Sequence, residues 1–278
     1  MTIKIVTDTT ADLPNSEIQA LKITRVPLYI NIGEESYLDE VEMSRADFYE
    51  GLPNFKHHPT TAVPGIDAFL NTYKKLIKKG ATSIFSFHIS KSLSNTVDVA
   101  RLAAEKIKEI PVHVIDSGNL SLGTGLIARV AAKMALAGEK VDQINNTIQD
   151  LIKRTYTFAV LDTLEFLKRS GRLSKFQYGL GSLLSVKPIL KMNNGETDME
   201  RVRTSSAGIK RLLELVKALE PLQELSYVHT HAVRRVEELK MLAKDIISPT
   251  SEPLVGEVTP VIGAHIGPGA VGFSIIKK

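Results

Sequence analysis

The sequence predicts an α/β protein of two domains, because strands and helices alternate in its first half and hairpin signals enter in its second. The chain has 278 residues, more than one compact core usually organises. Hydrophobic residues make up 43% and charged residues 24%, as in globular proteins. We expect a two-domain fold with a mostly parallel N-terminal sheet and flanking helices over residues 1–160. An α+β domain with a mixed or antiparallel sheet should follow over residues 161–278.

In the first half, short β-rich runs alternate with segments of helical periodicity. The expected strands cover residues 3–6, 25–30, 83–87 and 112–115. The expected helices cover residues 16–21, 44–52, 66–78, 96–107, 123–137 and 141–153. Ser44 is a suitable N-cap, and Gly80 and Gly138 suit the ends of two helices. This order indicates a parallel sheet with helices on both faces.

The second half mixes hairpins with helices. The expected strands cover residues 156–161, 185–192, 196–202, 225–229, 254–261 and 270–276. The expected helices cover residues 163–169, 207–219 and 233–246. Asn193, Asn194 and Gly195 form a strong hairpin turn signal between two of these strands. This pattern favours a mixed or antiparallel sheet.

Composition excludes several classes of protein. Cysteine is absent, which excludes disulfides, thiolate zinc sites and cysteine nucleophiles. The apolar start of the chain meets Asp8 at once, and no stretch approaches the roughly 18 apolar residues of a membrane span, so we expect a cytoplasmic protein. A net charge of +4 with 6% aromatics and no Trp does not indicate a nucleic-acid binder. Transient contact with a membrane surface stays open.

The glycine and histidine patterns do not indicate a nucleotide or metal site. Gly123 and Gly125 lack the third glycine and the preceding strand of a dinucleotide fingerprint, and no P-loop is present. No nucleophile elbow of the form Gly-x-Ser-x-Gly appears either. His229 and His231 are at strand spacing but have no clear third ligand. We therefore expect no metal.

Hydroxyl and amide side chains follow the expected parallel strands, where ligands bind in open sheets. Asp8 and the two threonines after it follow the first strand. Residues 89–96 follow the third strand, and Asp116 follows the fourth strand. Ser94 and Asn95 precede a helix whose N-terminus suits a carboxylate or phosphate. An ordinary helix cap is the alternative role for Ser94. Thr61, before Pro64, could likewise be only a turn residue.

Two further segments could contact an anion. His265 precedes Gly267 and Gly269, which allow a close approach of backbone to ligand, although a structural histidine is equally compatible. Residues 168–175 carry four positive charges and no acid. This basic segment is either a solvated face or a docking surface for a phosphate, a membrane or an acidic partner.

These segments together resemble the DegV family. The matching stretches, in chain order, are residues 6–13 (VTDTTADL), 59–64 (PTTAVP), 89–96 (ISKSLSNT), 116–117 (DS), 164–174 (LEFLKRSGRLS) and 265–270 (HIGPGA). They span nearly the whole chain. The sequence departs from the family pattern at Ala62 and Val63, where Ser and Gln are usual, and at Asn95, where Gly is usual.

The resemblance implies a protein that buries a long-chain fatty acid between its domains, with no cofactor. Similar family members are the fatty-acid-binding component of a bacterial two-part kinase. There a separate ATP-dependent kinase phosphorylates the bound carboxylate, so the carrier itself is not an enzyme. By motif, Thr61, Ser94, the Asn95 backbone N–H and His265 would surround the carboxylate. Arg172 and Arg203 would serve the partner or the phosphoryl group.

Two alternatives remain from the residues alone. The first is a stand-alone phosphotransferase or hydrolase that acts at an edge holding Asp8, Asp116 and His265. The second is a transport or sensing protein without a kinase partner.

Overall fold

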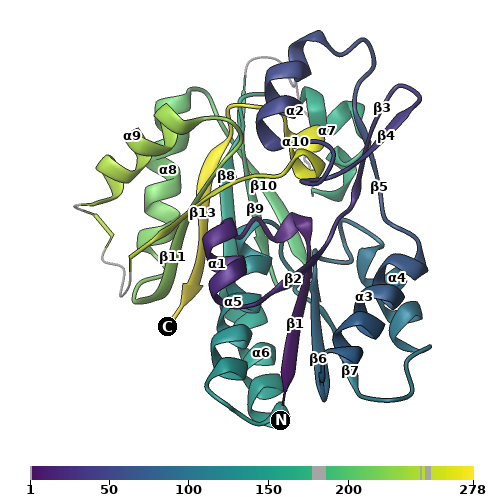
Figure 1. Ribbon diagram of the computed structural model, residues 1–278. Coiled ribbons are helices and arrows are strands. Elements are labelled where there is room, and N and C mark those ends of the chain that lie inside the picture. The colour runs from purple at the N-terminus through teal and green to yellow at the C-terminus, as the bar shows by residue number, and fades with distance from the viewer. Residues whose placement is uncertain (1, 177–185, 245, 248–251) are drawn as a thin grey trace.

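The computed structural model describes residues 2–176, 186–244, 246–247 and 252–278, and it contains a parallel sheet of four strands (Figure 1). Their order is β2-β1-β6-β7, and every pair is parallel. The strands are β1 (Ile3–Asp8), β2 (Thr24–Val26), β6 (Ser83–His88) and β7 (Val112–Asp116). One face is covered by α3 (Ile66–Lys78) and α4 (Thr96–Ala104), which bury apolar side chains against it.

A mixed sheet of six strands follows in the order β10-β9-β8-β13-β11-β12. Only the β11–β12 pair of this sheet is parallel. The strands are β8 (Thr155–Val160), β9 (Lys187–Asn193), β10 (Glu196–Val202), β11 (Leu222–His229), β12 (Leu254–Glu257) and β13 (Val271–Lys277). Helices α8 (Ser205–Lys217) and α9 (Val233–Lys244) cover its outer face. The predicted fold class is confirmed. Residue 185, the first residue of the strand predicted at 185–192, lies outside the described ranges.

The two sheets share the helices between them. Helices α5 (Leu122–Leu136) and α6 (Val141–Arg154) lie between the sheets in Figure 1. Helix α5 contacts strands of both sheets, and α6 contacts α5 and the mixed sheet. One continuous apolar core joins Phe85 of the parallel sheet, Leu126 and Ile127 of α5, and Ile276 of the mixed sheet. The apolar face of α5 therefore fixes how the two sheets sit relative to one another.

The glycines at the start of α5 have a packing role. A Cβ at Gly125 would lie 2.3 Å from the carbonyl oxygen of Ala11, and one at Gly123 would lie 2.1 Å from Oδ1 of Asn119. Such contacts are too short for any side chain. Gly125 therefore lets the helix approach the segment after β1 closely, and Gly123 lets it approach Asn119 and Thr157. This packing explains a glycine pattern that did not fit a nucleotide site.

A third, small antiparallel sheet was not predicted. It has the order β4-β3-β5, with β3 (Tyr29–Ile32), β4 (Glu35–Leu38) and β5 (Thr60–Ala62). Its core includes side chains of α2 (Arg45–Gly51) and α10 (Pro260–Ile266). The remaining short helices are α1 (Asn15–Ala20), α7 (Glu165–Arg169), and the 3₁₀ turns η1 (Thr9–Ala11), η2 (Leu52–Asn54) and η3 (Leu173–Lys175).

Two predicted strands were wrong in extent, and proline explains both. The strand predicted at 25–30 is split into β2 and β3, which belong to different sheets, because Pro27 has no N–H for a ladder. The strand predicted at 254–261 ends at Glu257. Pro260 then stands at the first position of α10, where its fixed φ suits a helix.

Several local predictions were confirmed. Ser44 caps α2, since its side chain accepts a hydrogen bond from the Asp47 backbone N–H. The hairpin at Asn194 and Gly195 has φ values of 47° and 83°, as a tight turn between antiparallel strands requires.

We predict that Leu126→Ala lowers the free energy of unfolding by about 2–5 kcal/mol, because it opens a cavity between the two sheets. Leu136→Ala on the same helix is the matched control, since Leu136 is 53% exposed and should change stability by less than about 0.5 kcal/mol. Urea denaturation of both variants measures the difference. Equal losses would show that α5 does not carry the shared core.

Candidate functional site

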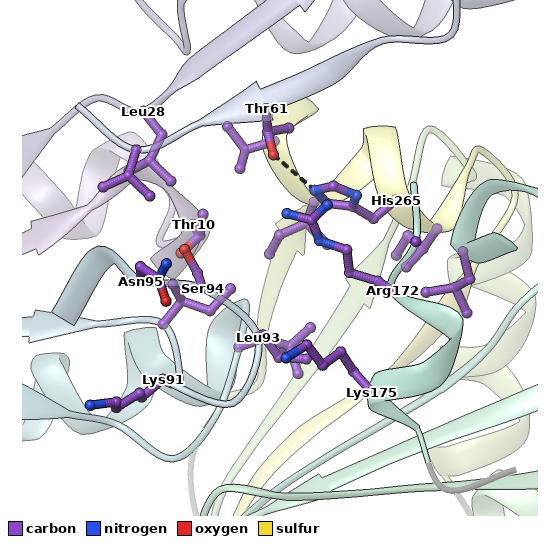
Figure 2. A pocket seen from close by; sticks show the side chains of 18 of the residues that line it. Thr10, Leu28, Thr61, Lys91, Leu93, Ser94, Asn95, Arg172, Lys175 and His265 are labelled. Carbon is purple, nitrogen blue, oxygen red and sulfur yellow. Dashed lines mark hydrogen bonds between the residues drawn. The ribbon is translucent and has the colours of Figure 1, made fainter. Parts of the chain in front are cut away.

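A cavity of about 410 Å³ lies where the loops after β1 and β6 meet α10 and the segment after α7 (Figure 2). This volume is typical of small-molecule sites. The apolar part of its wall includes Leu28, Leu93, Leu120, Leu167, Phe176 and Ile262. The polar part includes Thr61, Ser94, Asn95, Arg172, Lys175 and His265. The wall therefore combines residues from both halves of the chain, which suits a long ligand with one polar end.

A second, smaller cavity of about 30 Å³ shares part of this wall. The shared residues are Leu120, Phe176, Leu190, Ile262 and Ile266. Its further lining includes Ala159, Met192 and Val228. The apolar side of the main cavity therefore continues toward the face of the six-stranded sheet.

Thr61 and His265 meet at the polar side of the cavity. Thr61 lies on β5, whose backbone pairs with β3, and His265 lies near the end of α10. The Thr61 hydroxyl and Nε2 of His265 are 3.0 Å apart, at hydrogen-bond distance (Figure 2). Arg172 lines the same part of the wall. Two residues 204 positions apart in sequence thus form one polar surface.

His265 is neutral at physiological pH. Its burial, the Arg172 guanidinium and the nearby His58 ring lower the pKa of His265 from its ordinary value to about 4. Its other ring nitrogen, Nδ1, is buried and has no hydrogen-bond partner among the described residues. A neutral imidazole carries one proton, so only one of its two ring nitrogens can donate a hydrogen bond.

The start of α4 forms the facing wall. Asn95 is the N-cap of α4 but makes no side-chain cap bond. The Ser94 hydroxyl is 2.8 Å from the Thr96 hydroxyl and accepts a long 3.4 Å bond from the Thr96 backbone N–H. No hydrogen bond from the Asn95 backbone N–H is found within the described ranges. An unpaired N–H at a helix N-terminus suits an anion.

Positive charges border the cavity. Lys91, Arg172 and Lys175 line it, and none of its lining residues in the described part of the chain is acidic. The Arg172 guanidinium donates to the Ser170 carbonyl at 2.8 Å, which holds it against its own loop. The cavity therefore attracts a negatively charged group.

Asp8 has a structural role. Its carboxylate accepts bonds from the Thr10 backbone N–H at 2.9 Å and from the Ile89 backbone N–H at 3.3 Å. It also lies 2.9 Å from Nδ1 of His88, whose Nε2 is 2.7 Å from the Ser86 hydroxyl. Asp8, His88 and Ser86 are fully buried, so this chain of hydrogen bonds anchors the end of β1 and is closed to a substrate.

Asp116 is likewise engaged by its own loop. Its Oδ1 accepts bonds from the backbone N–H groups of Gly118 at 2.9 Å and Lys91 at 3.3 Å. In the part of the chain that the structure describes, no hydrogen bond or ion pair joins Asp8 or Asp116 to His265. The arrangement gives no support to an acid–base site built from these three residues.

The structure thus brings Thr61, Ser94, Asn95, His265 and Arg172 together around one cavity. Arg203 is not among the lining residues; it is exposed and directly follows β10. The apolar residues that α10 contributes were missed, because a strand was predicted through residue 261 and no helix was predicted over residues 262–266. The signal that could have found them is Thr259 followed by Pro260, a common helix start.

His229 and His231 do not meet as ligands. Nδ1 of His229 accepts from the Ala232 backbone N–H at 3.2 Å, and Nδ1 of His231 is 3.3 Å from the Glu257 carboxylate. Among the described residues, no three His, Cys, Asp or Glu side chains are placed to share a metal ion. Within the same ranges, every helix is too short or too polar to cross a bilayer.

Comparison with known proteins agrees with this architecture. The family model of DegV, described as an uncharacterised protein of that family, matches residues 2–278. The chain belongs to the DegV family. A DegV domain-containing protein of Streptomyces coelicolor is 35% identical over 99% of both chains, and one of Halalkalibacterium halodurans is 35% identical over 98% of this chain and 97% of its own. The predicted resemblance is therefore confirmed.

Solved structures of this family have the same fold. A DegV family protein from Thermus thermophilus, described as binding fatty acid, superposes with a TM-score of 0.90 at 30% identity and full coverage of both chains. DegV of Bacillus subtilis, described as a fatty acid binding protein, gives a TM-score of 0.87, also at 30% identity and full coverage.

We predict that His265 stays neutral between pH 5 and 8 and titrates with a pKa of about 4. Arg172→Ala should raise the pKa of His265, because a neighbouring positive charge that disfavours imidazolium is removed. NMR titration of the ring signals, assigned with His265→Gln, measures both values. Lys91→Ala is the control, since Lys91 lines the cavity without lowering this pKa. A midpoint near 6.5 in the unmodified protein would contradict the burial of His265.

Proposed function

We propose that this DegV protein binds a long-chain fatty acid, with the carboxylate at the polar side of the cavity and the acyl chain along the apolar wall. The observation that carries this proposal is an apolar cavity whose polar residues are donors and cations, without an acid among the described lining. The fatty-acid-binding descriptions of the Thermus thermophilus and Bacillus subtilis relatives support the same ligand class.

The apolar wall supplies the affinity. Burial of each methylene contributes about 0.8 kcal/mol, so a sixteen-carbon chain gains roughly 10 kcal/mol before the costs of association. The continuation of the cavity past Phe176 and Leu190 extends the apolar surface available to the tail. Affinity should therefore rise with chain length until the cavity is filled.

The polar side offsets the cost of burying a carboxylate. An unpaired buried carboxylate costs several kcal/mol. The Ser94 hydroxyl and the Asn95 backbone N–H can donate to it, and so can the Thr61 hydroxyl when Nε2 of the neutral His265 ring donates its proton to Thr61. Because these donors are uncharged, they leave the carboxylate less firmly neutralised than a direct lysine pair would, so it keeps nucleophilic character.

We further propose that the protein presents this carboxylate to a separate ATP-dependent kinase in the cytoplasm, which forms an acyl phosphate. The carrier then needs no cofactor and performs no catalysis of its own. Arg172 at the cavity and Arg203 on the exposed surface after β10 would serve the phosphoryl group or the partner. The exposed basic residues Lys168 and Arg169 support contact with an acidic partner or, transiently, with an anionic membrane surface.

We predict that the purified protein carries fatty acid and that Thr61→Ala combined with Ser94→Ala lowers its affinity at least about tenfold. Each lost bond to a charged group is worth about 1.5–3 kcal/mol. Mass spectrometry after denaturing extraction identifies the ligand, and titration of delipidated protein measures affinity. Thr60→Ala is the matched control, because Thr60 is the exposed neighbour of Thr61 on β5. Unchanged affinity in the double variant would refute the placement of the carboxylate.

We predict that Arg203→Ala slows acyl-phosphate formation by an added kinase at least about fivefold, a loss of roughly 1 kcal/mol, while fatty acid binding stays unchanged. Lys210→Ala on α8 is the control, since it removes an exposed positive charge from the next helix. Coupled assays with the purified kinase and radiolabelled ATP provide the rate. Equal rates of acyl-phosphate formation for Arg203→Ala and Lys210→Ala would show that Arg203 does not contribute to contact with the partner.

A further inference from the structure

One face of the parallel-sheet domain gathers positive charge from two segments. Residues 74–79 (KKLIKK) form the end of α3 and the residue after it, and residues 105–109 (EKIKE) directly follow α4. We call these two segments the lysine face. They contain six lysines and two glutamates, a formal charge of +4 that equals the net charge of the whole chain. The rest of the protein is therefore neutral in sum.

The two segments of the lysine face lie next to one another in the fold. Leu76 of α3 and Ile107 after α4 belong to the same apolar core. Lys74 is also close enough to Glu109 to interact electrostatically with its carboxylate. The lysines of both segments therefore act as one cluster of charge.

These lysines are available to a partner. All six are exposed, and none of them forms an ion pair with a described residue. The lysines that do form ion pairs in those ranges lie elsewhere, at Lys91, Lys133, Lys187, Lys191, Lys217 and Lys240. Interaction with the α3 dipole accounts for Lys75 and Lys78 in the last turn of that helix. It does not explain why lysines of a second segment join them.

The residue types of the lysine face favour a phospholipid surface as the partner. Neither segment contains an arginine or an aromatic residue, so the face lacks the planar fork that pairs with a carboxylate and the rings on which bases stack. Compact ammonium groups suit the diffuse negative charge of anionic headgroups. Leu102 of α4, which is 47% exposed, lies one turn before Lys106. An apolar side chain beside lysines is typical of surfaces that bind in the bilayer interface.

The lysine face lies at the opposite edge of the parallel sheet from the cavity. Its two segments precede the amino ends of β6 and β7, whereas the cavity lies beyond the carboxyl ends of β1 and β6. Since β6 has six residues, about 20 Å of strand separate the two edges. The amino end of β1, which pairs with that of β6, lies far from α10 in Figure 1.

We propose that the lysine face docks this protein on an anionic phospholipid bilayer and leaves the rim of the cavity free. The inference goes beyond the proposed function, because it does not depend on which ligand the cavity holds. It separates the surface that meets the bilayer from Arg172 and Arg203, which lie on or near the cavity side of the molecule. A docked protein can then contact a second macromolecule at the cavity rim.

The test measures sedimentation of the full chain with vesicles. Mixed vesicles of phosphatidylcholine and phosphatidylglycerol should bind the protein at low salt, whereas high salt or pure phosphatidylcholine should abolish binding. Gln at four lysines should weaken binding at least about twentyfold, because each lysine at an anionic surface contributes about fivefold and at least two of the four are in contact. The replaced residues are Lys74, Lys75, Lys78 and Lys79.

Two control variants separate charge from other effects. Arg at the same four positions keeps the charge and should bind mixed vesicles like the unmodified protein. Gln at four exposed lysines outside the lysine face should also leave vesicle binding unchanged. These control positions are Lys153, Lys210, Lys217 and Lys244.

Equal vesicle binding by the unmodified protein and the lysine-face Gln variant would overturn the inference. Loss of vesicle binding only when Lys168 and Arg169 are replaced by Gln would also overturn it, because the bilayer would then lie at the cavity rim. Binding of duplex DNA in place of vesicles would overturn the bilayer as the partner. Palmitate affinity of the lysine-face Gln variant should equal that of the unmodified protein, so failure of vesicle docking leaves the proposed function standing.

Discussion

The structure depends on helix α5 packing against two sheets at once. Its apolar residues join the parallel sheet and the mixed sheet into one core, and Gly125 lets its first turn approach the loop after β1. Because this packing fixes both sheets, it also fixes the loops at their edges. The cavity lies among those loops, so its shape follows from the shared core.

The polar side of the cavity shows how segments distant in sequence build a site for an anion. Each donor comes from a different kind of element: Thr61 from a strand, Ser94 and Asn95 from a helix start, and His265 from the last turn of α10. None of them carries a charge at neutral pH, since the pKa of His265 is lowered to about 4. The positive groups, Arg172 and Lys175, come from the segment after α7. Neutral donors with nearby cations suit a ligand with one negatively charged group.

The residues whose types would suit acid–base catalysis have a structural role in this protein. Asp8, His88 and Ser86 repeat the order of groups in a hydrolytic triad, yet all three are buried and hold the end of β1 in place. Both carboxyl oxygens of Asp12 likewise accept hydrogen bonds, from the Ser121 hydroxyl and the Thr259 backbone N–H, and so tie together segments that line the cavity. Asp8 and Asp12 therefore position segments around the cavity, while the polar groups that line the cavity are hydroxyls, an amide, a neutral ring and cations.

The sequence alone determined the fold class, most of the regular elements and the residues that gather at the polar side. Local signals sufficed for the elements and for Ser94 and Asn95, because helical periodicity, the Asn-Gly turn and polar residues after strands act over a few positions. Thr61 and Arg172 were assigned to the site through the resemblance to the DegV family. Only the tertiary structure decided the small third sheet, the helix α10, and the pairing of Thr61 with His265. These features arise from contacts between segments about 30 to 200 residues apart, such as β5 with β3 and β5 with α10. Short-range periodicity does not predict which distant segments pair with one another.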